Sequence, residues 1–99
     1  MEFQIVKIAC SNIIYVQGLK DYAKIRLDNS EKNILSLITL KSLEEKLPKR
    51  KFMRIHKSFI ISLDKVTSVT KKAVYIDNFM VPVSDQYKDG FARFFESWK

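Results

Sequence analysis

Few residues in this chain could support catalysis or hold a metal. It contains one histidine, His56, and one cysteine, Cys10, far apart in the sequence, whereas a zinc site takes three or four ligands. Glu44 and Glu45 are adjacent carboxylates on the outer face of a predicted helix, a poor arrangement for acid–base chemistry. Phosphate-binding and dinucleotide-binding fingerprints are absent. We therefore expect a protein that is not an enzyme and that needs no cofactor and no metal.

Cys10 also bears on the cellular compartment. A lone cysteine forms no intrachain disulfide, which fits a reducing environment. Its place after an apolar stretch favours a buried small side chain, with a reactive thiol as the alternative. The N-terminus lacks a signal-peptide pattern, and no apolar run approaches the roughly 18 residues that span a bilayer. These features predict a cytoplasmic protein without a membrane partner.

The charge balance points to polyanionic partners. The 99 residues suit one domain, and they carry a formal net charge of +7. A surplus of this size on a small domain favours DNA, RNA or anionic membrane, the alternative being a generally basic, soluble surface.

The densest basic segment spans residues 46–57. Apolar residues such as Phe52 and Ile55 interrupt it and can anchor it in a core, so that its charges take fixed positions. A solvated, lysine-rich loop is the alternative. A lone histidine at a strand break, such as His56, is more often a structural hydrogen-bonding residue than a ligand. The segment contributes the following side chains: Lys46, Lys49, Arg50, Lys51, Arg54, His56 and Lys57.

Two further polar clusters follow strands. The first contains Lys20, Asp21, Tyr22 and Lys24, and its pattern alone slightly favours an ordinary hairpin tip with a surface tyrosine. The second contains Ser84, Asp85 and Gln86, for which helix capping is the alternative interpretation.

Hydrophobic spacing predicts many short strands and two helices. Apolar residues alternate or cluster in the segments 3–8, 13–16, 22–27, 33–38, 52–55, 58–62, 66–70, 73–76 and 79–83. Gly18 breaks the second pattern, and tight turns are expected at residues 28–30, 71–72 and 77–78.

One helix should start at a Thr39 cap and end before Pro48, with leucines 40, 43 and 47 on one stripe. The second should be capped by Ser84 and carry an aromatic stripe, formed by Tyr87, Phe91, Phe94, Phe95 and Trp98. The fold class is therefore mostly β, with short antiparallel strands, one short internal helix and one C-terminal helix. No helix-turn-helix is visible, so loops or strands must make any DNA contacts.

Four segments of the sequence resemble the LytTR-type DNA-binding domain. They are IYVQGLKDY at residues 14–22, TLKSLEEKLP at 39–48, RIHKSFIISLD at 54–64 and VPVS at 81–84, followed by a helix. The resemblance covers nearly the whole chain, in matching order and spacing, and assigns residues 1–99 to one such domain without a receiver domain.

This resemblance implies a compact, elongated β fold that serves as the output domain of a bacterial two-component response regulator. It implies sequence-specific binding of double-stranded DNA for transcription regulation, through loops that enter the major groove at direct-repeat promoter sites. The implied partners are double-stranded DNA and a receiver domain outside this chain, with a homodimer on DNA left open.

The three family loops fall on Lys20, Asp21 and Tyr22, then on His56, Lys57 and Ser58, then on Ser84 and Gln86. Some relatives carry arginine where this chain has Gln86, which leaves the preferred bases open. Candidates for contact with the DNA backbone are Lys24, Arg50, Lys51 and Arg54.

Two alternatives of other classes remain. The chain could bind single-stranded nucleic acid, with Tyr15 and Tyr22 as stacking platforms. It could also be a β-rich protein-interaction module, if the aromatic stripe of the last helix is exposed rather than part of the core.

Overall fold

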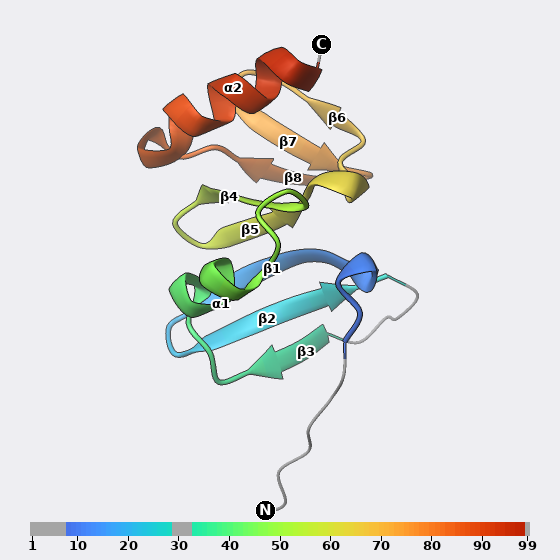
Figure 1. The fold of residues 1–99 in the computed structure, drawn as a ribbon, viewed down its shortest axis with the longest axis vertical. Helices are drawn as coiled ribbons and strands as arrows, with labels where there is room; N and C mark the ends of the chain where they lie inside the picture. Colours follow the sequence, from blue (N-terminus) through green and yellow to red (C-terminus); the bar gives the residue numbers. More distant parts are fainter. Residues whose placement is uncertain (1–7, 29–32, 99) are drawn as a thin grey trace, which may run out of the picture.

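A computed structural model describes residues 8–28 and 33–98 of the chain. Apart from Ile8, the predicted strand at 3–8 lies outside these residues, as does most of the turn at 28–30. The described strands form two antiparallel sheets, which confirms the predicted fold class. Figure 1 shows helix α2 at one end of the molecule, the smaller sheet beneath it, and the larger sheet with helix α1 further along.

The larger sheet has five strands in the order β3-β2-β1-β5-β4. Their bounds are β1 Ile13–Leu19, β2 Tyr22–Leu27, β3 Asn33–Ser36, β4 Phe52–His56 and β5 Phe59–Ser62. The smaller sheet has the order β6-β7-β8, with β6 Ser68–Val69, β7 Ala73–Ile76 and β8 Phe79–Pro82. The α-helices are α1 Leu40–Lys46 and α2 Lys88–Trp98, and the short 3-10 turns are η1 Cys10–Asn12, η2 Leu63–Lys65 and η3 Asp85–Tyr87.

Two hydrophobic cores lie on opposite faces of the larger sheet. One core joins this sheet to the smaller sheet and to Phe91 of α2, and the other joins it to α1 through Leu40. Strand β5 contributes to both, because Ile61 belongs to the first core and Ile60 to the second. This two-sided burial explains why residues 59–62 are a continuous apolar run closed by a buried serine, rather than an alternating strand.

Helix α1 matches its prediction. The Oγ1 atom of Thr39 accepts a hydrogen bond of 3.1 Å from the backbone N–H of Ser42, as an N-cap does. Leu40 is buried, and Leu43 and Leu47 pack against the same core. The helix has only seven residues, so its stability depends on this packing.

Gly18 does not end the first strand, contrary to the prediction. Strand β1 continues through it to Leu19, and Gly18 pairs with Ala23 of β2. A Cβ atom at this position would lie 2.9 Å from both Cγ and Cδ1 of Leu40. Glycine is needed here because α1 packs directly on the strand, not because the backbone turns.

Other boundaries also differ from prediction. Strand β6 is limited to Ser68–Val69, since part of the predicted segment precedes it without strand pairing. Helix α2 begins at Lys88, after the 3-10 turn η3, so Ser84 does not cap it. The Ser84 side chain makes no capping hydrogen bond to η3 either.

Candidate nucleic-acid interface

The predicted polar tips lie at one edge of the molecule. In Figure 1, the β1–β2 turn, the β4–β5 turn and the segment between β8 and α2 all lie on the left. The turn between β6 and β7 joins them, because the backbone N–H of Val83 donates to the carbonyl of Lys72 over 2.8 Å. We call these four segments, residues 20–22, 56–58, 71–72 and 84–88, together with Lys41 beside them, the basic edge.

The first tip is the turn between β1 and β2. Leu19 pairs with Tyr22, so Lys20 and Asp21 form a two-residue connection. Lys20 has φ of 53°, in the left-handed region that lysine rarely adopts. Lys20, Asp21 and Tyr22 are all exposed, with Tyr22 exposed at 46%. The tight pairing therefore holds a cation and an aromatic ring outward at the end of the sheet.

The second tip is the turn between β4 and β5. The Nδ1 atom of His56 accepts a hydrogen bond of 3.0 Å from the backbone N–H of Ser58, so the neutral ring carries its hydrogen on Nε2. This contact supports the structural role expected for a lone histidine. Lys57 is exposed at the tip. The carbonyl of Ser58 accepts from the N–H of Gly18 at 2.8 Å, which ties this turn to the strand that carries the first tip.

The third segment follows β8. The backbone N–H of Ser84 donates to the carbonyl of Ile55 in β4 at 3.0 Å, which sets this segment beside the second tip. Asp85 and Gln86 are exposed. The Oγ atom of Ser84 is buried and has no hydrogen-bond partner among the described residues. Of the two family positions here, the structure therefore presents Gln86 to solvent and turns the Ser84 hydroxyl inward.

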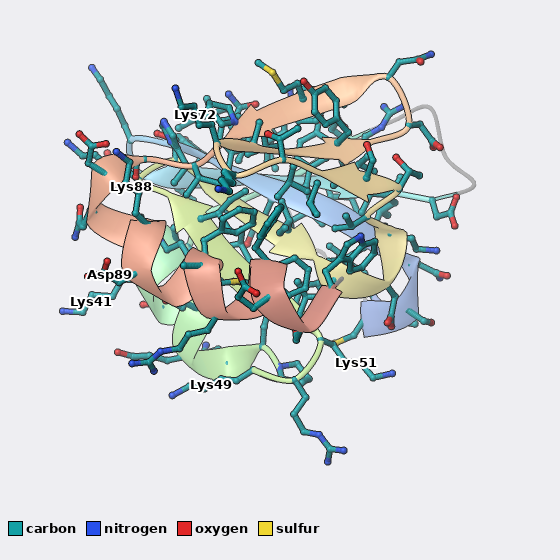
Figure 2. The ribbon with its side chains drawn as sticks, turned by 90° about the horizontal axis from the view of Figure 1, so that it is seen from above. Lys41, Lys49, Lys51, Lys72, Lys88 and Asp89 are labelled. Atoms are coloured by element: carbon teal, nitrogen blue, oxygen red, sulfur yellow. The ribbon has the colours of Figure 1, made fainter. Side chains whose placement is uncertain are left out.

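The predicted backbone contacts do not all lie at this edge. Lys24 is half-buried in the middle of β2. Arg50 and Lys51 are exposed in the loop before β4, at the opposite end of that strand from the Lys57 tip. At about 3.3 Å per residue, the five residues of β4 separate the two ends by roughly 16 Å. Figure 2 shows Lys51 on the side away from Lys41 and Lys88.

Arg54 points inward. Its side chain is only 15% exposed, and it contacts Glu44, Tyr87 and the backbone of the second tip. The structure therefore brings together Lys20, Asp21, Tyr22, His56, Lys57, Ser58 and Gln86, of which His56 and Ser58 are half-buried and the others exposed, and it leaves Lys24, Arg50, Lys51 and Arg54 outside this group.

Sequence reasoning did not assign Lys41 and Lys72 to this site. Lys41 lies in the first turn of α1 and lines a pocket that it shares with Lys20, Lys57 and Ser58. Figure 2 shows Lys41, Lys72 and Lys88 projecting on one side of the molecule. For Lys72 the sequence does contain an indication. Alternate turns of a β-meander lie at the same edge of the sheet, so the β6–β7 turn should share an edge with the segment after β8. No local pattern indicates that this edge also carries the other tips.

Charge is distributed unevenly along the basic edge. Within residues 8–28 and 33–98, no carboxylate lies within 4 Å of the ammonium group of Lys20, Lys41, Lys57 or Lys72. Lys88 is different, because its Nζ lies 2.8 Å from Oδ1 of Asp85. That hydrogen bond and the charge of Lys88 lower the pKa of Asp85, and Asp85 in turn raises the pKa of Lys88. The edge therefore presents several uncompensated cations to an approaching anion.

Two other kinds of feature are absent from the described part of the chain. It contains no group of three or more histidine, cysteine, aspartate or glutamate side chains placed to hold a metal ion. No helix in that part has the length and apolar character required to cross a membrane.

Comparison with known proteins identifies similar sequences. A family model described as the LytTr DNA-binding domain matches residues 4–96. Proteins named "Sensory transduction protein LytT" from Bacillus anthracis and Bacillus cereus are each 33% identical over 93 residues, covering 88% of this chain and 37% of the relative. The chain thus spans little more than a third of the length of these curated relatives.

Comparison with solved structures identifies a similar fold. A solved structure from Bacillus cereus, described as the "LytTr DNA-binding domain of putative methyl-accepting/DNA response regulator", superposes with a TM-score of 0.78 at 24% sequence identity. The match covers 91% of this chain and 86% of that one. At this identity the likeness establishes the mostly β architecture.

Proposed function

The chain belongs to the LytTR family of DNA-binding domains, and we propose that it binds double-stranded DNA through the basic edge. The observation that carries this proposal is the gathering of three separate tips at one edge, where backbone hydrogen bonds fix their relative positions. One duplex can then contact all three without any recognition helix. B-form DNA has a major groove about 12 Å wide, which admits a two-stranded turn.

Each side chain at the tips has a role that fits its chemistry. Lys57 suits a guanine edge or a phosphate, and Gln86 suits the N6 and N7 atoms of adenine. The backbone-anchored Ser58 suits a phosphate oxygen. Lys20, Lys41 and Lys72 add electrostatic attraction to the phosphates without reading bases. Tyr22 lies beside them and can pack against a sugar or a thymine methyl group.

The wider role that we propose rests on the family resemblance, with support from the names of the relatives. The matched curated relatives are named as sensory transduction proteins and are much longer than this chain. We infer that this domain is the output part of a response regulator, which binds direct-repeat promoter sites in the major groove and regulates transcription. A receiver domain is its expected covalent partner, and two copies would occupy neighbouring half-sites.

The single-strand alternative finds less support. The ring of Tyr15 stacks on Phe79, with centroids 4.5 Å apart and planes at 13°, so that face of the ring is occupied. The interaction-module alternative is weakened too, because Phe91 is 1% exposed, and Phe94 and Phe95 pack against the same core. Trp98 is the exception in this stripe, with 43% of its surface exposed.

Selection from random duplex oligonucleotides tests the proposal. The purified domain should enrich one short motif, and its affinity for that motif should fall with salt at a log–log slope of about −0.9 per contacted phosphate. A scrambled duplex and the matching single strand are the controls. Equal affinity for the enriched and scrambled duplexes, or preference for the single strand, would refute duplex sequence recognition.

A further inference from the structure

Arg54 stands apart from the other cations of the basic segment. It lies on β4 immediately before a register shift in the pairing with β5, between Arg54 and His56. Its side chain is 15% exposed, whereas Lys57 and Lys51 are exposed. A buried cation without partners would strongly destabilise the fold, so its contacts indicate what it does.

The guanidinium of Arg54 contacts three different elements. Its Nη2 donates to the carbonyl of Lys57 at 2.7 Å, and its Nε donates to the carbonyl of His56 at 3.4 Å. Its Nη1 lies 3.2 Å from Oε1 of Glu44 in α1. Its Cζ lies 5.7 Å from the centroid of the Tyr87 ring in η3.

These contacts use the whole guanidinium. Its nitrogens lie in a rigid plane and can bind two carbonyls and one carboxylate simultaneously, which a single ammonium cannot do in the same geometry. The face of the plane remains available for the aromatic ring of Tyr87. The group therefore joins the second tip to helix α1 on one side and to the third segment on the other.

We propose that Arg54 is a positioning residue, which sets the orientation of the Lys57 tip relative to Gln86 without contacting DNA itself. This inference rests on the proposed function, since it explains how two reading tips keep one geometry. The carbonyls that Arg54 binds belong to His56 and Lys57, the residues that form the tip. Tyr87 directly follows Gln86, so the ring contact restrains the third segment where its reading side chain projects.

The test compares Arg54→Met and Arg54→Lys with Arg93→Met, which removes one exposed arginine from α2. Binding is measured on the enriched and scrambled duplexes over a range of salt concentrations. In both Arg54 variants the ratio of the affinities for the enriched and scrambled duplexes should fall about tenfold, which is the contribution of one well-placed base contact. The salt slope on the scrambled duplex should stay at the wild-type value, and Arg93→Met should keep the full discrimination.

A second measurement needs no DNA. Hydrogen exchange of the Ser58 amide, which donates to His56 in the free protein, should become several-fold faster in both Arg54 variants, while amides of β7 keep their rates. Glu44→Gln keeps an oxygen acceptor and should show a smaller change. This milder variant also covers the case in which Arg54→Met fails to fold.

Three results would overturn the inference. If the Arg54 variants reduced the salt slope by about 0.9 but kept the preference for the enriched duplex, Arg54 would be a phosphate contact. Full rescue by lysine would show that charge alone matters, and unchanged Ser58 exchange would show that the turn does not depend on Arg54. A wild-type domain that does not discriminate between duplexes would refute the proposed function, while the exchange data would still decide whether Arg54 holds the tip.

Discussion

The two edges at which the strands end carry similar residues in different arrangements. At the edge opposite the basic edge, Lys65 lies 2.8 Å from Asp28, and Lys51 lies 3.9 Å from Asp64. Lys57 and Lys72 on the basic edge have no such carboxylate neighbour among the described residues. Exposed ion pairs add little to stability, so the pairing matters mainly because it cancels charge. Lys57 and Lys72 therefore keep their charges available to an approaching anion at the basic edge.

Tight turns with left-handed backbone occur at both edges. Among the described residues, two non-glycine residues have positive φ, Lys20 on the basic edge with φ of 53° and Asp77 on the opposite edge with φ of 54°. A left-handed backbone therefore reflects tight turns in general and does not by itself mark a binding site. Backbone hydrogen bonds join separate segments at both edges, as between Leu63 and Lys51 on the opposite edge, so what distinguishes the basic edge is that Lys57 and Lys72 have no carboxylate within 4 Å among the described residues.

The largest effect is expected when paired lysines are removed from each edge. Lys20→Ala with Lys72→Ala should weaken duplex binding roughly 50-fold at 0.1 M salt and reduce the salt slope by about 1.8, because two phosphate contacts are lost. Lys51→Ala with Lys65→Ala removes the same charge from the opposite edge and should change affinity only a few-fold. Titration of both double variants at several salt concentrations measures the difference. Equal losses would show that only net charge matters.

A substitution at Gly18 tests the packing beneath the basic edge. Gly18→Ala should lower the free energy of unfolding by about 1–3 kcal/mol, because its Cβ would meet Cγ and Cδ1 of Leu40 at 2.9 Å. Gly90→Ala is the control, since its Cβ would meet only Met53 Cε at 3.9 Å and alanine favours a helix by up to about 1 kcal/mol. Denaturant unfolding should give changes of opposite sign, and a neutral Gly18→Ala would contradict the close packing of α1.

The two left-handed residues separate stability from binding. Lys20→Gly and Asp77→Gly should each stabilise the fold by up to about 1 kcal/mol, because glycine adopts this backbone without steric cost. Only Lys20→Gly should weaken duplex binding, with a salt slope reduced by about 0.9. Thermal unfolding and binding titrations on the same samples measure both effects. A loss of affinity in Asp77→Gly would place part of the interface on the opposite edge.

The smallest effect is expected at Asp85. Asp85→Asn releases Lys88 from its 2.8 Å contact, so duplex affinity should rise a few-fold with a slightly steeper salt dependence. Because Lys88 lowers the pKa of Asp85 from 3.8, the carboxylate stays charged at any pH above about 4, and its interaction is lost only as the pH falls below that value. The variant should therefore differ from wild type equally at pH 6 and pH 8. A gain that appeared only at pH 8 would contradict this assignment.

Much of the fold could be predicted from local patterns. Alternating burial in β2 and the Thr39 cap of α1 match their predictions, because each depends on neighbours within a few residues. The predicted length of β6 was wrong. Only Ser68 and Val69 pair with β7, although the residues of the predicted segment favour a strand. The prediction that Gly18 ends the first strand is wrong, because glycine is required there by contact with Leu40, which lies 22 positions away in the sequence.

The candidate site was only partly predictable, for a similar reason. The three tips at residues 20–22, 56–58 and 84–86 came from the family resemblance, and the structure brings them to one edge. The inward turn of Arg54 and the buried hydroxyl of Ser84 depend on neighbours from distant segments. Lys41 and Lys72 join the edge for the same reason.

The sequence by itself determined that this is a small, basic, mostly β domain of the LytTR family, because hydrophobic period, net charge and motif order are properties of the chain read residue by residue. Only the tertiary structure decided which cations share an edge. That choice follows from the placement of β5 between β1 and β4 and from the hydrogen bonds of Gly18 and Ser84 to distant carbonyls. Strand pairing across long sequence separations sets these directions, and no local pattern encodes them.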